Sequence, residues 1–417
     1  MPMAPWALDA GIGESAMRQG ERNFLLIGLA YVSFVSLGLP DGLLGIAWPS
    51  VRASFSLPLD ALGALLVMFT TGYLLSSCSS GWLLEHLNVG ALLALSCLAT
   101  ALSLLGYALV PWWWGMVALG TLSGLGAGAI DTGLNTFAAT HFSPRLVNWL
   151  HACYGIGASS GPVLMTSVLN MQRPWQWGYG IVGVGQLLLA ACFVLTRRWW
   201  PAVRPAPAAA AGPLPSNWST LRLPVVWLSM AVFFVYTGLE AAAGAWTYSL
   251  FTEARSVPTM TAGMWVSLYW GALMIGRLLA GVVVHVVSVQ RLLRLCLFHL
   301  ALGATLLWLN PTSTISFLGL ALMGLACAPI FPSLIATTPE RLGAVHTAPG
   351  VGFQIAAAVL GQSLLPSLIG VLARHHGLEI VGPALLTIAV GLLVLYEVLM
   401  RVGAVERRRH ACARLPC

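Results

Sequence analysis

The stretch "WWWGMVALGTLSGLGAGAIDTGLNTFAAT" (112–140) decides the fold class of this chain. It contains a single acid, Asp131, and no basic residue. An α-helix needs about 20 apolar residues to cross the hydrocarbon core of a bilayer. The run is therefore long enough to span a membrane, and it places a carboxyl group and the amide of Asn135 inside that span.

Apolar runs of this kind recur along all 417 residues, of which 58% are hydrophobic and 8% are charged. Soluble domains carry about 25% charged residues, so the composition excludes a soluble protein. We expect an all-α integral membrane protein. Its twelve predicted transmembrane helices cover 23–47, 61–84, 89–110, 112–140, 147–169, 177–196, 223–252, 261–286, 291–309, 313–337, 348–373 and 380–401.

The net charge of +7 indicates topology and predicts no nucleic-acid partner. All 20 cationic residues are Arg, and basic residues collect in the cytoplasmic loops of membrane proteins. With the N-terminus inside, fifteen arginines fall on the cytoplasmic side, four fall outside, and Arg277 lies within a span. This predicts a multi-pass protein of the cell membrane, the inner membrane in a prokaryote, with both termini cytoplasmic. No signal peptide, cofactor or metal site is expected.

The chain repeats itself once, at an offset of 200 residues. Gly38 falls on Gly238, Ser56 on Ser256, and Gly161 on Gly361. Two helix bundles in the same orientation form the parallel-repeat plan of some transporters. The predicted organisation is a cytoplasmic N-terminal segment (1–22), a six-helix bundle (23–196), a Pro- and Ala-rich cytoplasmic linker (197–222), a second six-helix bundle (223–401) and a cytoplasmic tail (402–417).

Two motifs add a family resemblance to this plan. In "GWLLEHLNVG" (81–90), Gly81 and Glu85 match the signature between helices 2 and 3 of the major facilitator superfamily. His86 stands where that family usually has Arg, and the usual Arg-Lys pair after the last Gly is missing. Together with the twelve spans and the repeat, the motif resembles that superfamily over nearly the whole chain, which implies the major facilitator fold.

A narrower resemblance covers roughly residues 36–162. The stretches "GLPDGLLG" (38–45), "GAIDTGLNTF" (128–137) and "NWLHACYGIGASSGP" (148–162) look like the fucose permease branch of sugar–proton symporters. In that branch helix 1 carries an acid, matched by Asp41, and helix 4 carries an acid and an Asn, matched by Asp131 and Asn135. The resemblance implies an importer of a hexose, deoxyhexose or related polyol driven by a cation gradient, with a proton preferred over sodium. We expect a monomer.

The intramembrane acids are the candidate proton carriers. A carboxylate at mid-bilayer costs about 2.5–3.5 kcal/mol on insertion scales, and burial disfavours its charged form. Such a group can be neutral in one conformation and ionised in another. Asp131 heads this set, with Asp41 and Glu240 beside it. Asp41 follows Pro40, which is predicted to interrupt or kink helix 1.

Polar and aromatic side chains complete the predicted site. Hydroxyl-rich solutes need paired donors and acceptors as well as apolar walls. The predicted substrate-binding residues are Asn135, Tyr154, His151, Gln354, Gln362, Trp246, Trp270, Tyr269 and Phe353. Residues predicted to form a gate or contacts between the two bundles are Glu85, His86, Arg277 and Arg145.

Two alternatives to import stay open at this stage. The aromatic content also suits an exporter of amphipathic drugs or metabolites. A membrane sensor or lipid-handling protein of the same fold is the other possibility. An enzyme is not expected, because no nucleophile–base arrangement is visible.

Overall fold

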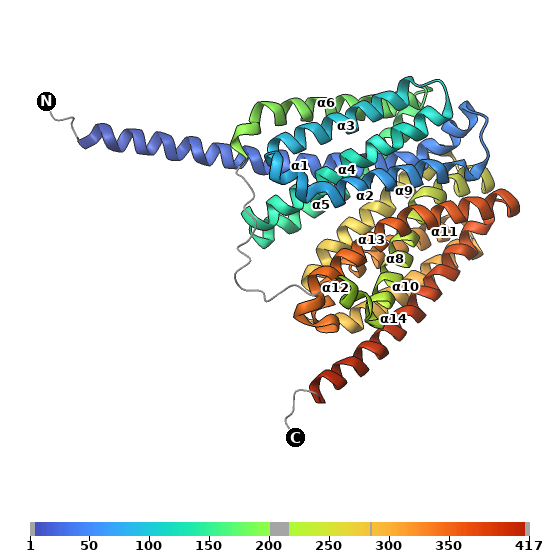
Figure 1. The fold of residues 1–417 in the computed structure, drawn as a ribbon. Coiled ribbons are helices and arrows are strands. Elements are labelled where there is room, and N and C mark those ends of the chain that lie inside the picture. Colours follow the sequence, from blue (N-terminus) through green and yellow to red (C-terminus); the bar gives the residue numbers. More distant parts are fainter. Residues whose placement is uncertain (1–4, 201–216, 284–285, 413–417) are drawn as a thin grey trace.

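The structure is a computed structural model that describes residues 5–200, 217–283 and 286–412. Over these residues the chain is helical, and no strand occurs. The helices form two groups that lie side by side, and both termini extend from the same end of the bundle (Figure 1). We call this the terminal end and the opposite one the far end.

The first half contains six long helices. They are α1 (Pro5–Ser54), α2 (Leu62–His86), α3 (Val89–Leu109), α4 (Trp113–His141), α5 (Pro144–Asn170) and α6 (Gln176–Thr196), with short 3-10 turns at Leu59–Ala61 (η1) and Arg197–Trp199 (η2). Helix α1 continues through Pro40, so the predicted interruption there is wrong. Spanning helices tolerate proline because neighbouring groups satisfy the freed backbone.

The second half repeats the order of the long helices, but the counterpart of α4 is divided into α11 and α12. It contains α7 (Asn217–Leu221), α8 (Pro224–Ser249), the π-helical turn η4 (Leu250–Ala254), α9 (Thr259–Val283), α10 (Val289–Leu309), α11 (Ser313–Cys327), α12 (Ile330–Ala336), α13 (Thr338–His376), the 3-10 turn η5 (Leu378–Ile380) and α14 (Val381–Cys412). The span predicted over 313–337 is present as Ser313–Ala336, but its helix is interrupted. It breaks at Ala328 and Pro329, because proline supplies no backbone N–H.

Within the described residues, eleven helices are long and apolar enough to cross a membrane. The remaining predicted span, 147–169, is also helical and lies within α5. Of the predicted linker 197–222, residues 201–216 lie outside the described part of the chain. The predicted domain boundaries therefore stay a prediction.

The internal repeat is visible in packing and in the backbone. Helix α1 packs on α5 as α8 packs on α13, and α2 packs on α4 as α9 packs on α11. Ser56 and Ser256, which are 200 residues apart, both adopt a left-handed φ of 53°. Such a φ is uncommon for a residue other than glycine, so its recurrence at the repeat offset shows that the two halves share a local backbone design.

The halves meet along α1–α8, α2–α13 and α5–α9. At the first seam Gly45 faces the backbone of α8, where a Cβ would stand 2.4 Å from the carbonyl oxygen of Gly244. A small residue is what permits this approach of two helices. Across the α5–α9 seam, the hydroxyl of Ser267 donates a hydrogen bond to the backbone carbonyl of Ser159 at 2.7 Å.

Two ion pairs also join the halves at the far end. Arg52 on α1 contacts Glu253 in η4 at 2.6 Å, and Arg374 on α13 contacts Asp60 in η1 at 3.1 Å. These pairs and the glycine contacts close the far end between the halves. Sequence spacing did not indicate the ion pairs, because the partners are separated by 201 and 314 residues.

Candidate functional site

Three carboxyl groups within the spanning helices, those of Asp131, Asp41 and Glu240, each contact a tyrosine hydroxyl. For Asp131 on α4, the donor is Tyr73 on α2, at 2.6 Å from Oδ2. The side-chain amide of Asn135 donates to Oδ1 at 2.9 Å. The predicted pairing of Asp131 and Asn135 on one helical face is therefore present. Both side chains are half-buried.

Asp41 on α1 accepts a hydrogen bond from the hydroxyl of Tyr154 on α5 at 2.7 Å. The contact follows from the close packing of these helices, in which Gly38 lies against the backbone of Tyr154. Asp41 is exposed although it lies within a predicted span. Its carboxyl group also interacts electrostatically with Glu240 on α8 and with Tyr73 on α2.

Glu240 on α8 is buried and belongs to the second half. Tyr236, one helical turn earlier, donates a hydrogen bond to its Oε2. The guanidinium of Arg277 on α9 lies 3.7 Å from its Oε1. The hydroxyl of Tyr269 donates to the backbone carbonyl of Glu240 at 2.9 Å. This carboxyl group therefore has both a hydrogen-bond donor and a cation as partners.

The two halves contribute to one group of polar side chains, which we call the central cluster: Asp41, Asp131, Asn135, His151, Tyr154, Glu240 and Arg277. Asp41 and Glu240 are close enough to interact electrostatically across the boundary between the halves. His151 on α5 interacts in the same way with Asp131 in its own half and with Arg277 in the other. The imidazole is exposed, and its ring packs edge-on against Phe34 at 5.3 Å. The predicted proton-coupling acids thus lie together.

The predicted gate residues are only partly described. Arg277 forms its ion pair with Glu240 of the same half, so this pair does not join the halves, and the gate role of Arg277 stays a prediction. His86 is exposed, its ring packs on Trp82, and its Nδ1 contacts the Trp82 carbonyl at 2.9 Å within one helix. The side chains of Glu85 and Arg145 lie outside the described part of the structure.

Several predicted substrate-binding residues are enclosed in the second half. Trp246 is fully buried, and its indole N–H donates to the Pro366 carbonyl at 2.8 Å. Tyr269 is also fully buried, and Trp270 is 6% exposed. The geometry gives these three rings little or no free surface, so we leave them out of the proposed site. The sequence alone could not distinguish these buried rings from aromatic side chains that line a cavity, because both kinds occur in apolar spans.

The two predicted residues on α13 differ in position. Gln362 is exposed, and it lies two residues from both Leu360 and Leu364, which are exposed apolar side chains. Residues two apart point about 200° apart on a helix. Gln362 therefore lies on the face opposite this apolar stripe. Phe353, seven residues before Leu360, falls on the stripe itself, which places it away from the central cluster.

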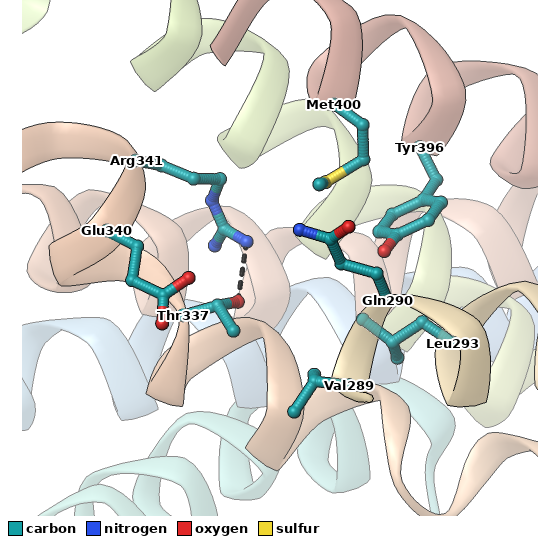
Figure 2. Close-up of a pocket in the computed structure, with 8 residues that line it drawn as sticks. All are labelled: Val289, Gln290, Leu293, Thr337, Glu340, Arg341, Tyr396 and Met400. Atoms are coloured by element: carbon teal, nitrogen blue, oxygen red, sulfur yellow. Dashed lines mark hydrogen bonds between the residues drawn. The ribbon is translucent and has the colours of Figure 1, made fainter. Parts of the chain in front are cut away.

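Gln354 belongs to another group of polar side chains, at the terminal end of the second half. Its Oε1 accepts from Thr338 at 3.1 Å, and Arg341 donates to the same hydroxyl at 3.1 Å and to that of Thr337 at 2.7 Å. Arg341 lines a cavity of about 10 Å³, and Figure 2 shows its guanidinium among the other lining side chains. That volume holds about one water molecule. Gln354 is fully buried there, so we also leave it out of the proposed site.

Sequence reasoning missed two of the three tyrosines. Tyr236 could have been found, because it stands four residues before Glu240 and therefore shares its helical face. Tyr73 gave no such signal, since 58 residues separate it from Asp131. Only the packing of α2 on α4 brings them together.

Comparison with known proteins agrees with this architecture. The family model described as "Major Facilitator Superfamily" matches residues 30–348. A protein TsgA homolog of Erwinia tasmaniensis is 27% identical over 77% of this chain and 80% of its own length. The sodium-dependent glucose transporter 1A of Mus musculus is 23% identical over 93% of this chain and 99% of its own length. A crystal structure of the E. coli fucose:proton symporter aligns with a TM-score of 0.60 at 17% identity, covering 90% of this chain and 98% of that one.

Proposed function

Because the chain belongs to the major facilitator superfamily and is a multi-pass membrane transporter, we propose that it moves a small polar solute by proton-coupled symport. The solute class is a hexose, deoxyhexose or related polyol. Alternating access between the two halves carries the solute across. The names of the glucose transporter and of the fucose:proton symporter support this class.

The observation that carries the proposal is the central cluster. Its acids come from both halves, and each has a hydroxyl partner. A carboxyl group at this depth can exchange its proton with a water-filled cavity in one conformation and be enclosed in another. Exposed Asp41, His151 and Gln362 supply acceptors and donors for solute hydroxyls, and half-buried Asn135 and Tyr154 stand beside them.

The closed far end supports a conformation open towards the terminal end. The ion pairs Arg52–Glu253 and Arg374–Asp60 join the halves at the far end. The excess of arginines in loops at the terminal end supports placing that end, with both termini, in the cytoplasm of the cell membrane. In this proposal the described conformation faces inward, and the ion pairs separate when the carrier opens outward.

Sodium is the second candidate coupling ion, on the strength of the name of the mouse relative. We keep the proton as the proposed coupling ion, and the sodium requirement measured in the transport test separates the two candidates.

The test uses proteoliposomes and a panel of sugars, polyols and amphipathic dyes added one at a time. Proton symport predicts external alkalinisation on addition of one solute class, without a requirement for sodium. Asp131→Asn is expected to retain solute exchange and to lose accumulation driven by a pH gradient. Glu397→Gln is the control, because Glu397 pairs with Arg294 at 2.6 Å within the second half. Full proton-driven uptake by Asp131→Asn would remove Asp131 from the mechanism, and dye efflux alone would favour the exporter.

A further inference from the structure

We propose that Tyr236 transmits the protonation state of Glu240 to the break between α11 and α12. The inference rests on the proposed proton coupling and adds a positioning residue to it. Tyr236 does not need to touch the solute. Its hydroxyl connects an acid of the central cluster to a discontinuity in a neighbouring helix.

The Tyr236 hydroxyl has fewer hydrogens than it has acceptors within reach. The Tyr236 hydroxyl lies within hydrogen-bond distance of two oxygen acceptors, Oε2 of Glu240 and the backbone carbonyl of Cys327 at 2.9 Å. A phenol has one hydrogen to donate. The Tyr236 side chain is fully buried, so water does not readily supply a second donor. A buried acceptor that loses its donor is destabilised.

The protonation state of Glu240 decides which acceptor receives that hydrogen. When Glu240 is neutral, its own O–H donates to the Tyr236 oxygen, and Tyr236 donates to the Cys327 carbonyl. When Glu240 is ionised, Tyr236 donates to the carboxylate, and the Cys327 carbonyl loses this donor. The change takes up one proton from water and forms one carboxyl O–H bond; every other change is an exchange of hydrogen bonds.

The Cys327 carbonyl lies where the chain leaves regular helix. Cys327 is the last residue of α11, and α12 begins only at Ile330, after Ala328 and Pro329. The break packs on α9, where a Cβ at Gly276 would meet that of Ala328 at 2.5 Å. A hydrogen bond from Tyr236 therefore fastens this irregular segment to α8. With Glu240 neutral, the hydrogen bond from Tyr236 holds the break against α8. With Glu240 ionised, that hydrogen bond is lost.

Charged and titratable groups on four other helices face Glu240 and set the balance between the two states. Arg277 on α9 lies 3.7 Å from its carboxylate, and Asp41 on α1 interacts with it electrostatically. The Tyr154 hydroxyl on α5 and the Cys327 thiol on α11 also interact with it electrostatically. Because Asp41 and Tyr154 belong to the first half, movement of the halves changes the field at Glu240.

Hydrogen–deuterium exchange of the full chain in nanodiscs, without solute, tests the relay directly. Exchange rates over residues 325–336 are corrected for the intrinsic effect of pH and compared with those of α10. We expect protection of this segment to rise about twofold to tenfold as the pH falls and Glu240 becomes neutral, the range set by one hydrogen bond. In Tyr236→Phe, which keeps the ring, the pH dependence should disappear.

Two further variants separate the relay from a general loss of packing. Glu240→Gln should hold the protected state at all pH values, because its amide donates to Tyr236 as a neutral acid does. Tyr248→Phe is the matched control, since Tyr248 is also a buried tyrosine of α8 but lies 12 residues after Tyr236; it should retain the pH response. An unchanged pH response in Tyr236→Phe, or none in the parent protein, would overturn the relay.

The outcome does not depend on the transported solute. A pH response that needs Tyr236 in a protein lacking proton-coupled uptake would leave the relay standing and reject the proposed function. Proton-coupled uptake in a protein without that pH response would support the proposed function and reject the relay.

Discussion

Removal of the far-end ion pairs should shift the carrier towards its outward-open form. Asp60→Asn and Glu253→Gln delete one partner of each pair between the halves while preserving side-chain size. The four side chains are 23–52% exposed, so each pair is screened and contributes about 0.2–1 kcal/mol. Together they contribute about 0.4–2 kcal/mol to closure. At 1.4 kcal/mol per factor of ten, the open-to-closed ratio should rise about twofold to thirtyfold.

The assay measures the distance across the far end by pulsed electron resonance. Spin labels at Met171→Cys, at the end of α5, and Met260→Cys, at the start of α9, report on separation of the halves in a background without native cysteines. Glu379→Gln is the matched control, because Glu379 pairs with Arg255 at 2.7 Å inside the second half. High salt should move the parent protein in the same direction as the double variant.

A distance distribution that stays the same in the double variant and in the parent would refute this reasoning. So would an equal shift in Glu379→Gln, since that variant leaves both contacts between the halves in place.

Three further outcomes are expected. Tyr73→Phe removes a donor that stabilises ionised Asp131, so the pH of half-maximal uptake should rise by about one unit, measured in proteoliposomes. Gly45→Ala places a Cβ 2.4 Å from the Gly244 carbonyl, so the spin-label distance should lengthen, and an unchanged distance would contradict close approach there. Trp246→Phe should lower the thermal unfolding temperature by a few degrees, as expected for about 1 kcal/mol, without changing the KM for solute; a changed KM would return Trp246 to the site.

Hydropathy predicted the spanning helices because the bilayer places the same requirement on every segment. The repeat predicted two matching halves. A run such as 112–140 has one stable arrangement in hydrocarbon, a helix, since only a helix or a closed barrel satisfies its backbone. The offset of 200 residues anticipated the matched packing of the halves and the shared left-handed φ of Ser56 and Ser256.

The candidate site was only partly predictable. Asp131 and Asn135 were paired because four residues on a helix bring side chains together, and the hydrogen bond between them is present. Trp246 and Gln354 were misplaced, because an apolar span contains buried and cavity-facing positions that look alike in one sequence. The break at Ala328 was also missed, although Pro329 marks it.

The sequence by itself determined that the chain crosses a membrane repeatedly, that it is built from two related halves, and that it carries acids at depth. Placing charge or unpaired backbone groups in hydrocarbon costs free energy in each segment separately. The sequence of a segment therefore indicates whether that segment spans the membrane. Only the tertiary structure decided which tyrosine contacts which acid, that Arg277 pairs within its own half, and that Arg52 and Arg374 join the halves. Those contacts depend on how helices far apart in the chain pack together.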